Sequence, residues 1–201
     1  MESLTFWLLW ASGLAISTFV GAYVVRNHRD TYGYVFLSTM LAIYIVSANI
    51  LVPRLITFYL IGTAFVLVTG SVIWAYTAQI SDMINEIYGK RHAYFSAFLA
   101  YLSNLMFVAF ILMAFQLTPL VEEGEDWFVS FFSVAGRVLI ASICSYTAAN
   151  YVDIRVFARI KRWAFDREQT AGNILAFSAL RSSVSDGLNM IIDNIVFYSI
   201  A

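Results

Sequence analysis

Long apolar blocks, separated by short polar breaks, follow one another along the whole chain. A helix needs about 20 predominantly apolar residues to cross the hydrocarbon core of a bilayer. Six blocks reach this length, and we expect each to form a transmembrane helix. They are Leu4–Val25, Tyr32–Val52, Leu55–Gln79, Ala93–Leu117, Phe128–Tyr151 and Asn173–Ala201. The third helix is expected to continue to Tyr88 and the fifth to about Arg159.

The continuity of these blocks decides between the two architectures that cross membranes. Strands of a transmembrane barrel show alternating segments of about ten residues with turn residues between them. The blocks in this chain are continuously apolar, so helices are expected. We therefore predict an all-α integral membrane protein, a polytopic bundle of six transmembrane helices. Residues 1–201 are expected to form a single transmembrane domain.

Composition excludes other classes of protein. Hydrophobic residues make up 61% of the 201 residues and charged residues 12%, whereas a soluble domain carries about 25% charged residues. The net charge is −1, and no basic stripe offers a footprint for nucleic acid. Membrane lipid is therefore the expected surrounding of the chain.

The sequence also lacks the patterns of common enzymes and metal centres. The one cysteine, Cys144, lies in an apolar stretch, and His28 and His92 lie far apart, so we predict no metal site and no cofactor. No Walker A, HExxH or GxSxG pattern is present. Their absence argues against ATP hydrolysis by the chain itself and against an enzyme.

Positive charges predict the orientation in the membrane. Nine of the twelve Lys and Arg residues lie in three breaks, and they are Arg26, Arg29, Lys90, Arg91, Arg155, Arg159, Lys161, Arg162 and Arg167. If six helices alternate in direction, these breaks share one side. Because basic residues accumulate in cytoplasmic loops, we expect a multi-pass protein of the cytoplasmic membrane with its N-terminus outside and its basic loops inside.

The sixth block carries polar residues that its surroundings disfavour, because an ionisable residue near the bilayer centre costs about 2.5–3.5 kcal/mol. One face of this predicted helix collects Ser182, Ser185, Asp186, Asn189 and Asp193. Arg181 lies beside this face and could neutralise Asp186. Polar residues of this kind either hold helices together or line a cavity for a substrate or a coupling ion. Two carboxylates on one face favour the cavity.

Two more polar groups lie near the ends of predicted helices. The first group lies on one face at the end of the third predicted helix and consists of Gln79, Asp82 and Glu86. Its carboxylates could meet water at the interface or reach the interior. The second group centres on Asp153, which could pair with Arg155 or Arg159, or act in gating.

Several of these segments resemble motifs of a known family. The pattern Ser81-Asp82-x-x-x-Glu86-x-Tyr88-Gly89-Lys90 resembles the Asp-x-x-x-Glu-x-Tyr-Gly-Lys segment of the YhhQ-type, or VUT, membrane proteins. The run from Asp153 through Phe157 to Lys161 is similar to that family's Asp-x-x-x-Phe-x-x-x-Lys run. Looser matches are Arg181-Ser182-Ser183 with Asn189, Asp193 and Phe197, and Ser47-Ala48-Asn49-Ile50 with Arg54. Together they extend from about Ala42 to Ala201.

The resemblance implies a transporter of queuosine precursors, which are 7-deazaguanine nucleobases; some members are described more loosely as vitamin uptake transporters. A guanine-like edge presents an N1–H and an amino group side by side, and one carboxylate can accept both hydrogen bonds. The candidate substrate-binding or coupling residues are Asn49, Gln79, Asp82, Glu86, Asp153, Arg181, Asp186, Asn189 and Asp193.

The resemblance also bears on mechanism and extent. Secondary transport by alternating access is the expected mechanism; the alternative is a substrate-binding membrane subunit of an energy-coupled vitamin or nucleobase uptake system. Family members carry a further hydrophobic helix beyond the position of Ala201, so the family pattern is expected to contain one more helix. The sequence leaves a homodimer open and identifies no obligate partner.

Overall fold

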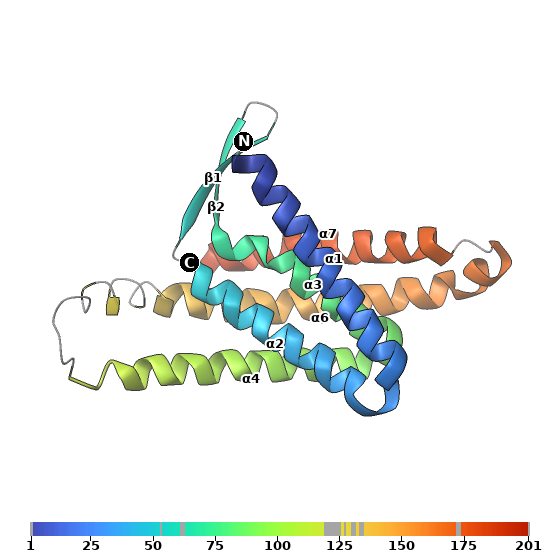
Figure 1. The fold of residues 1–201 in the computed structure, drawn as a ribbon, viewed down its shortest axis with the longest axis horizontal. Helices are drawn as coiled ribbons and strands as arrows, with labels where there is room; N and C mark the ends of the chain where they lie inside the picture. The colour runs from blue at the N-terminus through green and yellow to red at the C-terminus, as the bar shows by residue number, and fades with distance from the viewer. Residues whose placement is uncertain are drawn as a thin grey trace. The chain divides into compact units, whose positions relative to one another are not determined.

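The computed structural model describes residues 2–52, 54–60, 63–118, 126, 128–129, 132, 135–171 and 174–200. Its helices are α1 (Glu2–His28), α2 (Tyr34–Leu51), α3 (Trp74–Tyr88), α4 (Lys90–Ala114), α6 (Ala135–Ala171) and α7 (Ile174–Ile200). Two strands, β1 (Leu55–Leu60) and β2 (Thr63–Val68), lie between α2 and α3 in the sequence (Figure 1). A π-helical turn at Arg29–Gly33 joins α1 to α2, and a 3₁₀ turn at Thr69–Val72 precedes α3.

The chain divides into two compact units. The first unit comprises residues 1–80 and 99–135, and the second comprises residues 81–98 and 136–201. The second unit therefore contains the last two turns of α3, the start of α4, and α6 and α7. The expectation of a single transmembrane domain stays a prediction.

Helices occupy most of the predicted spans. The helices α1, α2, α4 and α7 coincide with the first, second, fourth and sixth blocks, and α6 contains the described part of the fifth from Ala135 onward. The α6 helix also continues past Arg159, as far as Ala171. The end of α3 at Tyr88 is confirmed.

Two helical stretches among the described residues are long and apolar enough to cross a membrane. They are Leu4–Leu51, which includes α1, the π turn and α2, and Lys90–Ala114, which is α4. Only 28% and 17% of their most apolar windows are buried. A core helix of a soluble protein would be mostly buried, so this exposure fits a lipid-facing surface. Crossing by the other predicted spans stays a prediction.

The prediction of a helix over Leu55–Gln79 is wrong for most of that range. The strands β1 and β2 pair antiparallel, with Leu55 opposite Val68 and Leu60 opposite Thr63. β-branched and aromatic residues dominate both strands, and such residues favour extended backbone. Hydropathy alone cannot separate a buried helix from apolar strands. The all-α prediction is confirmed for the fold as a whole, and this two-stranded hairpin is an exception within it. Six transmembrane helices stay a prediction.

Aromatic side chains of the first unit hold α1 against the segment that begins α3. The indole Nε1 of Trp10 donates to the carbonyl oxygen of Val72 at 2.9 Å, and the Tyr76 hydroxyl donates to the carbonyl oxygen of Trp10 at 2.7 Å. The two rings meet edge to face, with centroids 6.3 Å apart. A Cβ atom at Gly13 would come within 2.5 Å of the Tyr76 hydroxyl, so a glycine permits this close approach.

In the second unit, α6 and α7 pack side by side and antiparallel. The Arg181 guanidinium lies 5.7 Å from the centre of the Phe157 ring. Ser185 lies within hydrogen-bonding reach of Asp153, and Ser145 lies within reach of Asp193. In these contacts, residues with higher numbers on α7 lie beside residues with lower numbers on α6. The two helices are therefore antiparallel. Phe157, Ile154 and Ile84 are almost completely buried and form the apolar core of this unit.

A left-handed glycine separates α3 from α4. Gly89 has a φ of +85°, and its N–H donates to the carbonyl oxygen of Asn85. The Asn85 side chain in turn donates to the carbonyl oxygen of Ile154 at 3.2 Å. This turn therefore ends α3 where its last residues contact α6.

We expect Gly89→Ala to lower the free energy of unfolding by about 1 kcal/mol, because an alanine in the left-handed region is strained. No atom lies within 4 Å of the added Cβ, so backbone strain is its main cost. Gly187→Ala is the matched control, since Gly187 lies inside α7 with equally open surroundings. That change should stabilise the helix by about 0.5–1 kcal/mol. Unfolding of the purified protein in detergent measures both, and equal effects would contradict the assignment.

Candidate functional site

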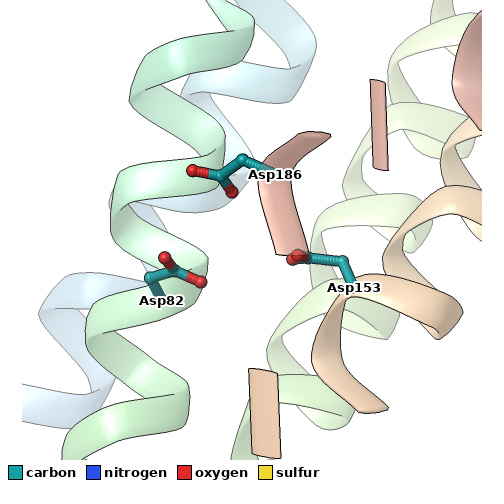
Figure 2. A group of neighbouring side chains, drawn as sticks. All are labelled: Asp82, Asp153 and Asp186. Atoms are coloured by element: carbon teal, nitrogen blue, oxygen red, sulfur yellow. The ribbon is translucent and has the colours of Figure 1, made fainter. Parts of the chain in front are cut away.

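Three carboxylates from three helices meet in the second unit. Asp82 of α3, Asp153 of α6 and Asp186 of α7 each place one oxygen within 4.8 Å of the others. Figure 2 shows these side chains pointing toward one another. We call these three residues the acidic triad. The sequence singled out each member separately, and the structure brings them together.

Local helix geometry explains why these carboxylates reach the interior. Asp82 lies on the buried face of α3, and its side chain accepts a hydrogen bond from the Ser182 hydroxyl of α7. Only 8% of Asp82 is exposed. Of the two interpretations of this helix end, the structure supports the interior position for Asp82, whereas the Glu86 side chain is 37% exposed. The serine supplies a neutral dipole and no compensating charge.

Glu86, one turn after Asp82 on α3, has two basic partners. The Arg181 Nε lies 3.1 Å from Glu86 Oε2, and the Lys161 Nζ lies 3.3 Å from Glu86 Oε1. Lys161 also donates to the backbone carbonyl oxygen of Glu86. The side chain of Arg181 is only 3% exposed. These ion pairs connect α3 with α6 and α7, which fixes the helices that carry the acidic triad.

The two acidic groups therefore differ in charge balance. One carboxylate at Glu86 meets two cations, while the described residues form no salt bridge with the acidic triad. At an effective dielectric constant of about 20, two like unit charges 4 Å apart repel by about 4 kcal/mol. If all three carboxylates are ionised, the acidic triad repels itself, so it favours the uptake of protons or of a cation.

Two pairings expected from the sequence are replaced by others. The sequence allowed Arg181 to neutralise Asp186, but the ion pair of Arg181 is with Glu86 of α3. For Asp153 it allowed a pair with Arg155, with Arg159 or with the cationic end of another helix. Asp153 is instead 1% exposed and faces the acidic triad, while Arg155 lies on the outside of α6 over the Tyr151 ring at 4.0 Å.

The polar face of α7 continues beyond the acidic triad to Asn189 and Asp193. Asp193 lies near Ser145 of α6, and its Oδ1 is buried without a hydrogen-bond donor among the described residues. Asn189 precedes Asp193 by four residues and therefore shares its face of the helix. The predicted polar stripe is thus inside the second unit over part of its length, with Ser185 fully buried.

The remaining predicted residues have other positions. Asn49 lies on α2 in the first unit, where its amide donates to the Asn104 side chain of α4 and to the carbonyl oxygen of Ile45, both at 3.1 Å. This bond joins two apolar helices, a common role of polar residues in membranes. Gln79 lies half-buried on α3, three residues before Asp82. Asn104 is not among the residues predicted from the sequence, although an amide inside an apolar block is a usable signal.

We expect Glu86→Gln to destabilise the protein by about 1–3 kcal/mol, because it leaves the buried Arg181 without its charged partner. Lys161→Gln is the control, and its effect should be smaller because the Lys161 side chain is 31% exposed. A double variant, Glu86→Gln with Arg181→Gln, should cost less than the two single changes added together. Denaturant unfolding in detergent measures this coupling, and strictly additive effects would disprove it.

Comparison with known protein families shows which family this chain is similar to. The sequence model of a family described as "Putative vitamin uptake transporter" matches residues 68–201, about two thirds of the chain. The matched range includes α3, α4, α6 and α7, and with them the acidic triad and the ion pairs of Glu86. No curated protein and no solved structure matches the chain.

Proposed function

Because the chain belongs to the vitamin uptake transporter family, we propose that it imports 7-deazaguanine queuosine precursors across the cytoplasmic membrane as a secondary transporter. The motifs around Asp82, Asp153 and Asp193 support this choice of substrate within the family, since they resemble those of the queuosine precursor transporters. The exposed apolar surfaces of α1, α2 and α4 support a position in lipid.

One observation carries the proposal: α7 presents buried carboxylate oxygens that lack donors. The Oδ1 atoms of Asp186 and Asp193 receive no hydrogen bond from the described residues. Leaving such an oxygen unsatisfied is costly, whereas a ligand that donates hydrogen bonds would satisfy it. A 7-deazaguanine donates through its N1–H and its amino group, which lie side by side as a carboxylate requires.

Among the candidate carboxylates, Asp193 is the best placed to accept the base edge. Glu86 already has two basic partners, and Asp82 accepts a hydrogen bond from Ser182. Asp193 keeps an open oxygen, and Asn189 on the same face supplies an amide that can bind the carbonyl group of a base. The pair Asn189 and Asp193 therefore forms the proposed recognition edge.

The hairpin changes the proposed path through the membrane. Its outer edges carry unpaired backbone groups, so β1 and β2 lie outside the hydrocarbon core. The third crossing is then Thr69–Tyr88, which combines the 3₁₀ turn with α3. At 2.0 and 1.5 Å per residue, this segment spans about 30 Å, the thickness of the core. The basic breaks near Arg26 and Lys90 remain on one side, which is cytoplasmic by the positive-inside rule.

Uptake of labelled 7-cyano- or 7-aminomethyl-7-deazaguanine tests the function in cells that cannot make queuosine. Expression of the chain should give saturable uptake. Asp193→Asn should reduce it at least tenfold, because a charged hydrogen bond contributes about 1.5–3 kcal/mol and 1.4 kcal/mol is tenfold. The amide would also set its own NH₂ group against the donors of the base.

Asp30→Asn is the matched control for this experiment, since Asp30 is an exposed carboxylate in the π-helical turn. It should leave uptake unchanged. Full uptake by Asp193→Asn would remove Asp193 from the recognition edge. If the unmodified chain takes up neither compound, the deazaguanine substrate is wrong, while membership of the transporter family stands.

Reconstitution separates secondary transport from the energy-coupled alternative. We expect the purified chain in liposomes to accumulate the precursor when an ion gradient is imposed, without ATP. A dependence on a copurifying ATPase would instead identify the chain as the substrate-binding subunit of a larger system. Transport that equilibrates the precursor but never concentrates it would contradict gradient coupling.

A further inference from the structure

The acidic triad encloses a space of atomic size. Its three oxygens lie within 4.8 Å of one another, so an atom at their centre lies at most about 2.8 Å from each, which is that separation divided by √3. Figure 2 shows the carboxylates of Asp82, Asp153 and Asp186 converging from separate helices. Carboxylates that cluster on a surface are solvated, but Asp82 and Asp153 are 8% and 1% exposed.

Asp153 gives independent evidence that a ligand is needed there. Only 1% of the Asp153 surface is exposed, and its Oδ1 receives no hydrogen bond from the described residues. Buried carboxylate oxygens are almost always hydrogen-bonded, paired or bound to metal. The Oδ1 of Asp186 is in the same state on the opposite helix. Two buried oxygens therefore point into one space with nothing described to satisfy them.

The charges nearby do not answer this need. The basic side chains that reach the interior of the unit, Arg181 and Lys161, form their ion pairs with Glu86. Ser182 and Ser185 approach the acidic triad only with neutral hydroxyl groups. Ionised carboxylates buried together repel one another, so the acidic triad favours the uptake of protons or of a metal cation.

We propose that Asp82, Asp153 and Asp186 bind a hard metal cation through oxygen ligands. Hard cations such as Ca²⁺ take carboxylate, hydroxyl and water oxygens at about 2.3–2.6 Å, close to the distance that the triad offers. Zinc and other soft ions prefer histidine and cysteine ligands, and the triad consists of aspartates alone. The hydroxyl groups of Ser182 and Ser185 are available as neutral oxygens beside it.

The cation site extends the proposed function without depending on it. Asp186 precedes Asp193 by seven residues on α7, about 10 Å along the axis. The cation and the base edge would therefore bind to neighbouring turns of the same helix. This arrangement suits a coupling ion, and the proposal departs from the sequence-based expectation that the chain holds no metal.

Equilibrium dialysis of the full chain in detergent tests the site without any substrate. The protein is first freed of metal with a chelator and then dialysed against ⁴⁵Ca²⁺ or ²²Na⁺. Saturable binding of either ion is expected, and the two isotopes distinguish a divalent from a monovalent occupant. Asp153→Asn should weaken this binding at least tenfold, whereas Asp30→Asn, which changes an exposed carboxylate, should not alter it. Absence of saturable binding of both ions overturns the proposal, as does equal binding by Asp153→Asn.

Thermal unfolding provides a second readout if Asp153→Asn folds poorly. The bound ion should raise the unfolding temperature of the unmodified chain, because a ligand that binds only the folded state stabilises it. Asp186→Asn, at a half-buried position, should abolish this increase. An increase of the same size in that variant overturns the site. If the chain binds the cation but takes up no deazaguanine, the proposed substrate is wrong and the cation site stands. If it takes up a deazaguanine but binds no cation, the cation site is wrong and the substrate stands.

Discussion

Charged groups removed from water must find compensating charge, and the second unit is organised by this requirement. Arg181, whose side chain is 3% exposed, meets it through Glu86, and the ion pairs of Glu86 with Arg181 and Lys161 connect three helices. Removing the Glu86 carboxylate would leave the buried Arg181 charge less compensated, which is unfavourable. The position of α7 against α3 and α6 therefore depends in part on these ion pairs. The acidic triad, on the same helices, leaves the requirement open to a ligand.

The two proposed sites share a helix whose register is fixed by its neighbour. The antiparallel contacts of α6 and α7 place Ser185 beside Asp153 and Ser145 beside Asp193. A small shift of α7 would change the surroundings of both Asp186 and Asp193. Coupling between two ligands requires a structural element whose conformation both ligands influence. Because both proposed sites lie on α7, a cation and a nucleobase could favour the same position of this helix.

The first unit illustrates a different balance. Its helices expose apolar side chains broadly. Neutral groups form several of the described contacts between its elements, such as the Asn49–Asn104 hydrogen bond and the contacts of Trp10 with Val72 and Tyr76. Such contacts define helix pairs in lipid, where apolar surfaces alone give little preference. The family match begins only at residue 68, so it covers the charged unit completely and the first unit in part.

The amino-acid pattern alone predicted a membrane protein, most of the helices and, one by one, the carboxylates that the structure brings together. Hydropathy predicts these features because the cost of burying backbone and charge is local to each segment. It failed at residues 55–68, where apolar strands and an apolar helix have the same composition. Only the tertiary structure decided that Arg181 binds Glu86 and that Asp153 joins Asp82 and Asp186. Those residues are up to about a hundred positions apart, and only the packing of three helices determines which opposite or like charges become neighbours.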